Sequence, residues 1–408
     1  MLAKALLKNS FWVTTRYAYL SFTGFIVSLG FAHFVSKETF GQYQLVLATL
    51  GLLSFLSLPG LNIAAIKAMT KKQPQAVLEA IGYSFKWSLL AVPLLIGYGY
   101  YQLAHQQSVF GLSLIAAGVL FPLYYAPNTW YAFYEGQYQF RAVALRTIIS
   151  ATVVALALLT GLYFKLSVLW LVTIFLAVSS LFSFYFYLEI RRRLSGQPKR
   201  QKSLDLGFGL RVSLQKSVYT ISESLPPLAV GFLLGHASVA VFQIANLFLG
   251  AVSALIAALA AITLPALFTT PNATANAAQA LITGLLASLG YYLLVRLLFS
   301  YFYGPEYQTS YQIALLLTAL PLVVAIRTFL VNYFTTQEKT GTIIVTYVLA
   351  NLLSLGGFWL LTRSVSLVSA TSGYLYLLNL TIVLPLLIRY LLLLRPAGLP
   401  FPADRGKV

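Results

Sequence analysis

Six basic side chains lie in stretches of sequence that are otherwise apolar. They are Arg16, Lys86, Arg211, Lys216, Arg296 and Arg327, and the acid found among them is Glu223. A charge at the centre of a membrane span costs roughly 2.5–3.5 kcal/mol on insertion scales, so it should face a cavity or a partner. The positive excess predicts a hydrated cavity that attracts an anionic group such as a phosphate. The alternative is that long basic side chains snorkel to the lipid headgroups.

Glu223 lies one helical turn before two adjacent prolines, Pro226 and Pro227. Each proline lacks an N–H and clashes with the carbonyl four residues earlier, so we expect a kink that frees the carbonyls of Ser222 and Glu223. Carbonyls beside a carboxylate can hold Na⁺ or tune a proton site, which makes Glu223 the candidate ion-coupling residue. The alternative is a simple pairing of Glu223 with a basic neighbour. Apart from Na⁺ or H⁺ as a coupling ion we expect no cofactor and no metal site, because the chain has no cysteine and three scattered histidines.

Polar side chains recur along two of the segments that hold basic residues. In the first segment they are Ser10, Thr14, Tyr17, Ser21, Gly24 and Ser28, at the three- and four-residue steps of a helix face. In the segment around Lys216 they are Gln215, Tyr219, Thr220 and Ser222. We expect both faces to line a lumen, with ordinary packing of small polar residues as the alternative. The candidate substrate-binding residues are Arg16, Tyr17, Lys86, Arg211, Lys216, Tyr219 and Arg327.

A cluster of aromatic residues adds a weaker indication of a sugar ligand. Tyr124, Tyr125, Trp130, Tyr131 and Tyr134 lie in one segment beside Pro122 and Pro127. Tyrosine rings offer flat faces and hydroxyls, which suit sugar rings. The alternative is packing and anchoring at the membrane interface.

The composition determines which elements position these residues. Of the 408 residues 59% are hydrophobic and 9% charged, whereas soluble domains average about 25% charged. Uninterrupted apolar runs exclude a transmembrane β-barrel, whose strands alternate. With roughly 20 apolar residues needed per helix, we predict an all-α, polytopic membrane protein with 12 spans. They are 10–34, 42–68, 80–104, 109–134, 142–163, 167–189, 208–234, 238–268, 279–301, 309–334, 342–362 and 367–393.

Lysine and arginine placement predicts the orientation. Most basic loop residues fall on the side that holds both termini and the central basic loop, whereas the opposite loops hold Lys37, Lys165 and Arg363. By the positive-inside rule, both termini are expected in the cytoplasm and the protein in the cytoplasmic (inner) membrane. Short outer loops with few acids disfavour a membrane enzyme, and no Walker A motif appears.

The two halves of the chain repeat. A shift of 199 residues places 34–56 over 233–255, so that Gln44 meets Gln243 and Gly51 meets Gly250. Six spans per half predict a parallel repeat with the substrate site between two pseudo-symmetric six-helix lobes. The expected domains are an N-terminal lobe (1–190), a basic cytoplasmic linker (191–205), a C-terminal lobe (206–394) and a cytoplasmic tail (395–408).

Three segments resemble one family. Residues 32–69, reading AHFVSKETFGQYQLVLATLGLLSFLSLPGLNIAAIKAM, are similar to the entry of helix 2 of Wzx-type polysaccharide flippases. These belong to the MATE-like multidrug/oligosaccharidyl-lipid/polysaccharide exporter superfamily. Residues 132–148 and 231–248 are similar to its helix 4–5 and helix 7–8 turns. The resemblance implies a flippase that moves polyprenyl-diphosphate-linked oligosaccharides to the outer leaflet by alternating access.

With that function, the basic candidates would attract the diphosphate and the polar faces would hold the sugars. The expected partners are the lipid-linked oligosaccharide, membrane lipid and other polysaccharide-assembly membrane proteins, without nucleic acid. A MATE-type antiporter for cationic drugs is the first alternative, although it would call for more acids in the lumen. A membrane glycan polymerase or ligase is the second, and a membrane scaffold without transport is the third.

Overall fold

The computed structural model describes residues 2–195, 204–269, 273–337 and 339–394. These residues form helices joined by short turns, and none of them is in a strand. The first half contains α1 (Leu2–Phe34), α2 (Lys37–Leu53), η1 (Ser54–Ser57), α3 (Leu61–Thr70), α4 (Gln75–Ser88), α5 (Ala91–Ala104), α6 (Ser108–Tyr125), η2 (Pro127–Trp130), α7 (Tyr131–Glu135), α8 (Phe140–Tyr163) and α9 (Val168–Leu194). The second half contains α10 (Leu206–Leu234), α11 (His236–Thr269), α12 (Ala273–Phe302), η3 (Pro305–Tyr307), α13 (Gln308–Leu316), η4 (Leu317–Ala319), α14 (Leu320–Thr336), α15 (Thr340–Ser364) and α16 (Leu367–Leu394).

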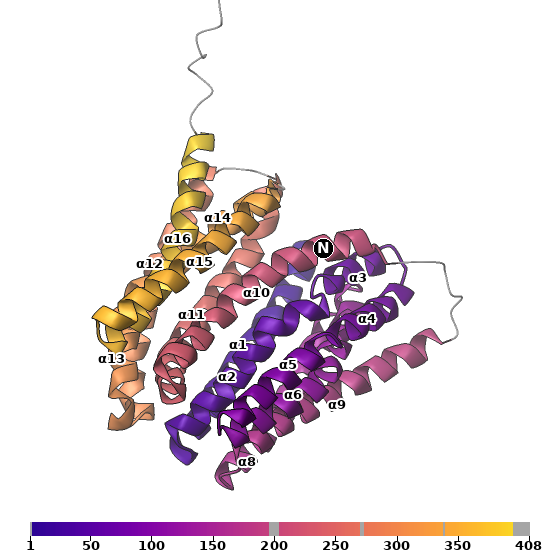
Figure 1. The fold of residues 1–408 in the computed structure, drawn as a ribbon. Helices are drawn as coiled ribbons and strands as arrows, with labels where there is room; N and C mark the ends of the chain where they lie inside the picture. The colour runs from indigo at the N-terminus through magenta and orange to yellow at the C-terminus, as the bar shows by residue number, and fades with distance from the viewer. Residues whose placement is uncertain (1, 196–203, 270–272, 338, 395–408) are drawn as a thin grey trace, which may run out of the picture.

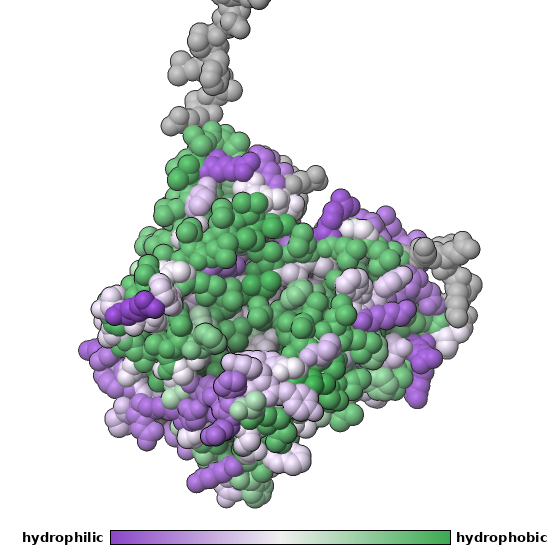
Figure 2. Space-filling model, in the orientation of Figure 1, coloured by the Kyte–Doolittle hydropathy of each residue, from purple (hydrophilic) through white to green (hydrophobic). Residues whose placement is uncertain are grey.

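The prediction of an all-α membrane protein is confirmed. Eleven stretches of the described chain are long and apolar enough to cross a membrane. Figure 2 shows apolar side chains over the middle of the visible face, with hydrophilic ones gathered toward its ends. The count of twelve is close, because the remaining expected span, 208–234, coincides with α10. Its 29 residues extend about 43 Å at 1.5 Å per residue, but its polar, charged and proline residues make it less apolar than the other eleven stretches.

Some expected spans are interrupted. The span predicted over 42–68 ends as α2 at Leu53, and the short helix α3 begins separately at Leu61. Leu58 between them has a left-handed φ of 54°, and Pro59 follows it. Proline restricts the residue before it and cannot donate a helical hydrogen bond, so the chain leaves the helix here. The predicted linker also begins later, since α9 continues to Leu194; 196–203 and the predicted tail 395–408 lie outside the described residues.

The internal repeat is confirmed by the positions at which helices begin. α2 begins at Lys37 and α11 at His236, 199 residues later, and α9 and α16 show the same offset. α6 and α13 begin 200 residues apart, as do α8 and α15. Figure 1 shows the two lobes side by side, with the start of α1 and the end of α16 at one end of the molecule. We call that end the inner end, and the end where α2 and α11 begin the outer end.

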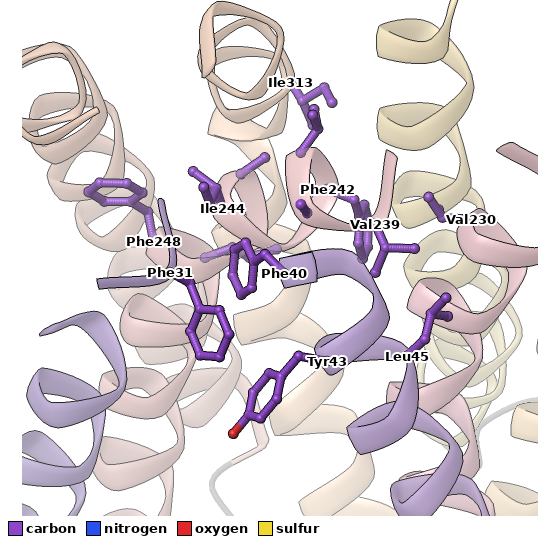
Figure 3. Close-up of a cluster of buried hydrophobic side chains, with 14 of the residues drawn as sticks. Phe31, Phe40, Tyr43, Leu45, Val230, Val239, Phe242, Ile244, Phe248 and Ile313 are labelled. Atoms are coloured by element: carbon purple, nitrogen blue, oxygen red, sulfur yellow. The ribbon is translucent and has the colours of Figure 1, made fainter. Parts of the chain in front are cut away.

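The lobes are joined by an apolar core toward the outer end. α2 packs on α10 and α11, and α1 also packs on α11. Phe31, Phe40 and Tyr43 of the first lobe lie in one buried cluster with Val239 and Phe242 of the second (Figure 3). A side chain at Gly41 would place its Cβ 1.8 Å from the carbonyl oxygen of His236. Gly41 is therefore required for the close approach of α2 to α11.

Candidate functional site

A cavity of about 1030 Å³ lies between the two lobes. Its walls come from α1, α2, α6, η2, α8 and α9 of the first lobe and from α11 and α12 of the second. Ser21, Gly24 and Ser28, half of the polar face expected on the first span, line it. Among the described residues that line this cavity there is no Lys, Arg, His, Asp or Glu. The lining of the large cavity is therefore mostly apolar, and its described polar side chains are uncharged.

Four amide side chains face this cavity. Gln44 on α2 and Gln243 on α11 are the pair that the repeat relates, and both line it together with Asn128 and Asn246. Within the described chain none of these four side chains has a hydrogen-bond partner, whereas other polar groups nearby bond to backbone carbonyls, as Thr23 does to Tyr19 at 3.0 Å. Each amide therefore keeps its donors and acceptor available to whatever fills the cavity.

The aromatic cluster divides between this cavity and packing. Tyr124 and Trp130 line the cavity. The Tyr131 hydroxyl accepts a hydrogen bond from the side-chain amide of Asn62 at 2.6 Å. Tyr134 is buried and donates to Glu189 at 3.0 Å. Two of the five predicted aromatic residues are thus placed to meet a ligand in the cavity.

Two of the predicted basic residues lie beside one acid in the inner half of the molecule. The Arg16 guanidinium on α1 donates to Glu135 at the end of α7 at 2.9 Å, and both side chains are largely buried, at 16% and 17% exposure. Lys216 on α10 lies close enough to Glu135 for their charges to interact. We call Arg16, Glu135 and Lys216 the inner charge cluster. Its net charge is +1, and it brings together helices of both lobes.

Tyr17 lies beside the inner charge cluster. The Arg16 guanidinium stands 5.1 Å from the centre of the Tyr17 ring, in cation–π range. Tyr17 is 45% exposed, so its ring both flanks Arg16 and remains open to a ligand.

A second group of charges lies inside the C-terminal lobe. Arg327 on α14 donates to the side-chain oxygen of Asn379 on α16 at 2.8 Å. The charges of Arg327 and Glu223 both act on the Tyr219 hydroxyl and on Tyr347. The predicted residues Tyr219, Glu223 and Arg327 are thus brought together, and the carboxylate of Glu223 is not isolated from basic groups.

The remaining basic candidates are exposed. Lys86 on α4 and Arg211 on α10 both have exposed side chains, and the Arg211 Nε donates to the backbone oxygen of Gly207 at 3.4 Å. Arg296 donates to the Tyr311 hydroxyl at 2.9 Å. These positions fit snorkelling, the alternative considered for long basic side chains.

Three charged residues of this region were missed by sequence reasoning. Glu135 and Glu189 stand at the ends of predicted spans, and Arg146 lies within one. The Arg146 guanidinium donates to both oxygens of Glu189, at 3.0 and 3.2 Å, and Arg193 donates to the same carboxylate at 2.7 Å. The charge of Arg146 in an apolar run was the available signal. The excess of unpaired positive charge is therefore smaller than the sequence indicated, because Arg16 also has an acidic partner.

The outer end carries a polar contact between the lobes. The Glu38 carboxylate on α2 and His236 Nδ1 on α11 lie 2.6 Å apart, and the ammonium group of Lys37 donates to the backbone oxygen of Glu306. The Glu38–His236 contact and the close approach at Gly41 hold the outer ends of α2 and α11 together, and Lys37 joins α2 to η3.

The family model described as "Polysaccharide biosynthesis protein" matches residues 6–270. No curated protein matches the chain.

Solved structures of membrane transporters share the fold. An inward-facing MATE-family multidrug resistance transporter of the MOP superfamily has a TM-score of 0.70 at 13% identity, covering 97% of this chain and 100% of the other. The lipid II flippase MurJ in an inward closed conformation also has a TM-score of 0.70 at 13% identity, covering 95% and 89%. A MOP-superfamily transporter from Pyrococcus furiosus has a TM-score of 0.65 at 12% identity, covering 95% and 94%. The chain thus has the fold of these transporters.

Proposed function

Because the chain belongs to the polysaccharide biosynthesis protein family, we propose that this multi-pass membrane protein is a flippase for polyprenyl-diphosphate-linked oligosaccharides. The observation that carries the proposal is that two chemically different sites lie at the interface of the lobes. One is the inner charge cluster, which suits a diphosphate; the other is the large uncharged cavity, which suits a hydroxyl-rich glycan. Such a substrate has both parts in one molecule.

The diphosphate is assigned to the basic residues around the interface. Arg16 and Lys216 would exchange Glu135 for phosphate oxygens, because a diphosphate carries more negative charge than a single carboxylate and a guanidinium can bind phosphate through two parallel hydrogen bonds. Arg327 would contribute from the C-terminal lobe, and the exposed Lys86 and Arg211 would attract the anion to the inner end. The lipid tail would stay in the bilayer while the lobes exchange access from the cytoplasmic to the outer side.

Export of cationic drugs by a MATE-type antiporter is the second candidate, supported by the shared fold. Cations require acids at the binding site. In the described chain the large cavity has none, and Glu223 lies with Arg327 elsewhere. The charge distribution therefore favours an anionic lipid substrate. Cytoplasmic termini, coupling to Na⁺ or H⁺ and contact with other polysaccharide-assembly proteins belong to the same proposal.

The test separates substrate binding by Arg16 from its ion pair with Glu135. The protein is reconstituted in liposomes with an undecaprenyl-diphosphate trisaccharide, and an impermeant glycosidase reports the exposed leaflet. Arg16→Gln removes a charge-assisted contact worth about 1.5–3 kcal/mol, so flipping at low substrate concentration should fall about tenfold to a hundredfold. The double variant R16Q/E135Q removes the unpaired carboxylate; it should recover thermal stability but not flipping.

The matched control is R146Q/E189Q, which removes an ion pair that is also mostly buried and should leave flipping near the wild-type rate. Full flipping by R16Q/E135Q would assign Arg16 to structure alone and contradict its role in binding. Absence of flipping by the wild-type protein, with export of a cationic dye instead, would favour the antiporter.

A further inference from the structure

The large cavity is lined by hydrogen-bonding side chains, but no charged side chain belongs to its described lining. A charged ligand group would therefore find no opposite charge there. Gln44, Asn128, Gln243 and Asn246 present free amides there, and each amide offers two donors and one acceptor. Ser21 of α1 also lines the cavity. Such a set matches sugar hydroxyls, which also both donate and accept.

Apart from these amides and several serine and threonine hydroxyls, the lining is mostly aromatic or aliphatic. Tyr124 and Trp130 stand on the side of the first lobe, and Phe248 and Phe302 come from α11 and α12 of the second. Flat apolar rings can pack against the C–H faces of sugar rings while the amides meet the hydroxyls, since pockets commonly combine apolar walls with a few placed polar groups. Its volume of about 1030 Å³ is at the upper end of the roughly 300–1,000 Å³ that small-ligand pockets occupy.

We propose that this cavity selects uncharged saccharides and discriminates against acidic ones, such as those with a hexuronic acid. The proposal rests on the flippase function proposed above and specifies its substrate class. Removing an ionised carboxylate from water is costly unless a positive charge compensates for it. No basic side chain belongs to the described lining. Arg16 is paired with Glu135 outside it, and in the proposed mechanism Arg16 and Lys216 bind the diphosphate, while Arg327 donates to Asn379.

Both lobes contribute to the selection. Gln44 belongs to α2 and Gln243 to α11, and the repeat relates them. A glycan that contacts both amides spans the two bodies that must move relative to each other. Its fit would therefore influence the rate of flipping as well as the affinity.

The experiment compares two substrates that differ at one carboxyl group. Both carry undecaprenyl diphosphate; one bears a neutral trisaccharide of glucose and galactose, and in the other a glucuronic acid replaces one glucose. The wild-type protein should flip the neutral substrate at least about tenfold faster at low concentration, a difference of 1.4 kcal/mol. Because lipid and diphosphate are identical, the ratio reports the saccharide alone and requires no variant.

Variants then locate the effect. Asn246→Lys introduces a positive charge into the cavity and should reduce the preference for the neutral substrate, whereas Asn246→Gln keeps the amide and should retain it. Equal rates for both substrates, or faster flipping of the acidic one, would overturn the inference and leave the flippase function intact. Failure of the wild-type protein to flip either substrate would refute both.

Discussion

At the scale of single side chains, Glu135 determines how strongly Arg16 and Lys216 can attract an anion. It lies 119 residues from Arg16 in sequence and yet accepts its hydrogen bond, while Lys216 adds a second positive charge nearby. A pair of this kind avoids leaving a buried charge unpaired. It also leaves the cluster one positive charge in excess, so that an incoming anion can compete with the carboxylate. The inner charge cluster thus joins helices of both lobes, and in the proposed function it also binds the anionic part of the substrate.

Glu223 provides the first prediction at this scale. Its charge acts on Tyr219 beside Arg327, so Glu223→Gln removes the negative charge that a Na⁺ ion or a proton would need. If Glu223 couples transport, flipping by this variant should lose its dependence on pH or on a Na⁺ gradient. Flipping rates are measured in liposomes with and without each gradient.

Glu306→Gln is the control for the coupling prediction. It makes the same acid-to-amide change at the outer end of the molecule, where the acid's backbone oxygen rather than its side chain contacts Lys37. This variant should retain the wild-type dependence. An unchanged dependence in Glu223→Gln would remove Glu223 from coupling and leave it as a partner of neighbouring basic groups.

At the scale of elements, the contact of α2 with α11 closes the outer end. A methyl group at Gly41 would collide with the His236 backbone at 1.8 Å, and backbone cannot rotate away as a side chain does. Gly41→Ala should therefore separate the outer ends of the two helices and slow flipping. Spin labels on cysteines introduced at the outer ends of α2 and α11 measure the separation, because the chain has no native cysteine.

Gly82→Ala is the matched control for that contact, since a Cβ there meets no heavy atom within 4 Å. It should leave the label distance and the flipping rate unchanged. An unchanged distance in Gly41→Ala would show that the contact does not hold the outer end closed.

The start of α10 carries a pH-dependent stabilisation. The Phe208 N–H donates to the Asp205 carboxylate at 3.0 Å, and the Lys67 ammonium lies 3.6 Å from the same carboxylate. The hydrogen bond and the nearby positive charge lower the pKa of Asp205 below its ordinary value. A depressed carboxyl pKa stabilises the folded state above the ordinary range, and this contribution is lost as pH falls through the lowered value. Asp205→Asn, which can still cap the helix, should therefore show a smaller fall in melting temperature on acidification. An identical fall in both proteins would contradict this role.

At the scale of the whole molecule, the features that the sequence predicts are those with a linear signature. Apolar run length identified the helices, and the shift of 199 residues found the repeat that α2 and α11 confirm. The polar face of the first span was predicted because it follows helical spacing, and Ser21 and Ser28 do line the cavity. Such signals need only local periodicity.

Features that depend on the packing of distant segments were not predictable in the same way. The partner of Arg16 is far away along the chain, and Ser222, expected on a lumen face of α10, instead accepts a hydrogen bond from Asn351 at 2.7 Å. The lining of the large cavity includes no residue of α10, so the two expected polar faces do not share it. Burial and pairing follow from how the lobes meet, which hydropathy does not encode.

The central claim is that this chain flips a lipid-linked oligosaccharide by opening and closing its two lobes. Glu38 and His236 meet across the outer end, so the variant E38C/H236C offers the only two thiols in the protein for a cleavable bifunctional reagent. Flipping of the undecaprenyl-diphosphate trisaccharide is measured with the linker in place, with complete linking verified by mass spectrometry, and again after cleavage. We predict that the linked protein flips no faster than protein-free liposomes and recovers after cleavage, while Glu38→Cys alone is unaffected by the reagent. Undiminished flipping by the fully linked protein would contradict the claim.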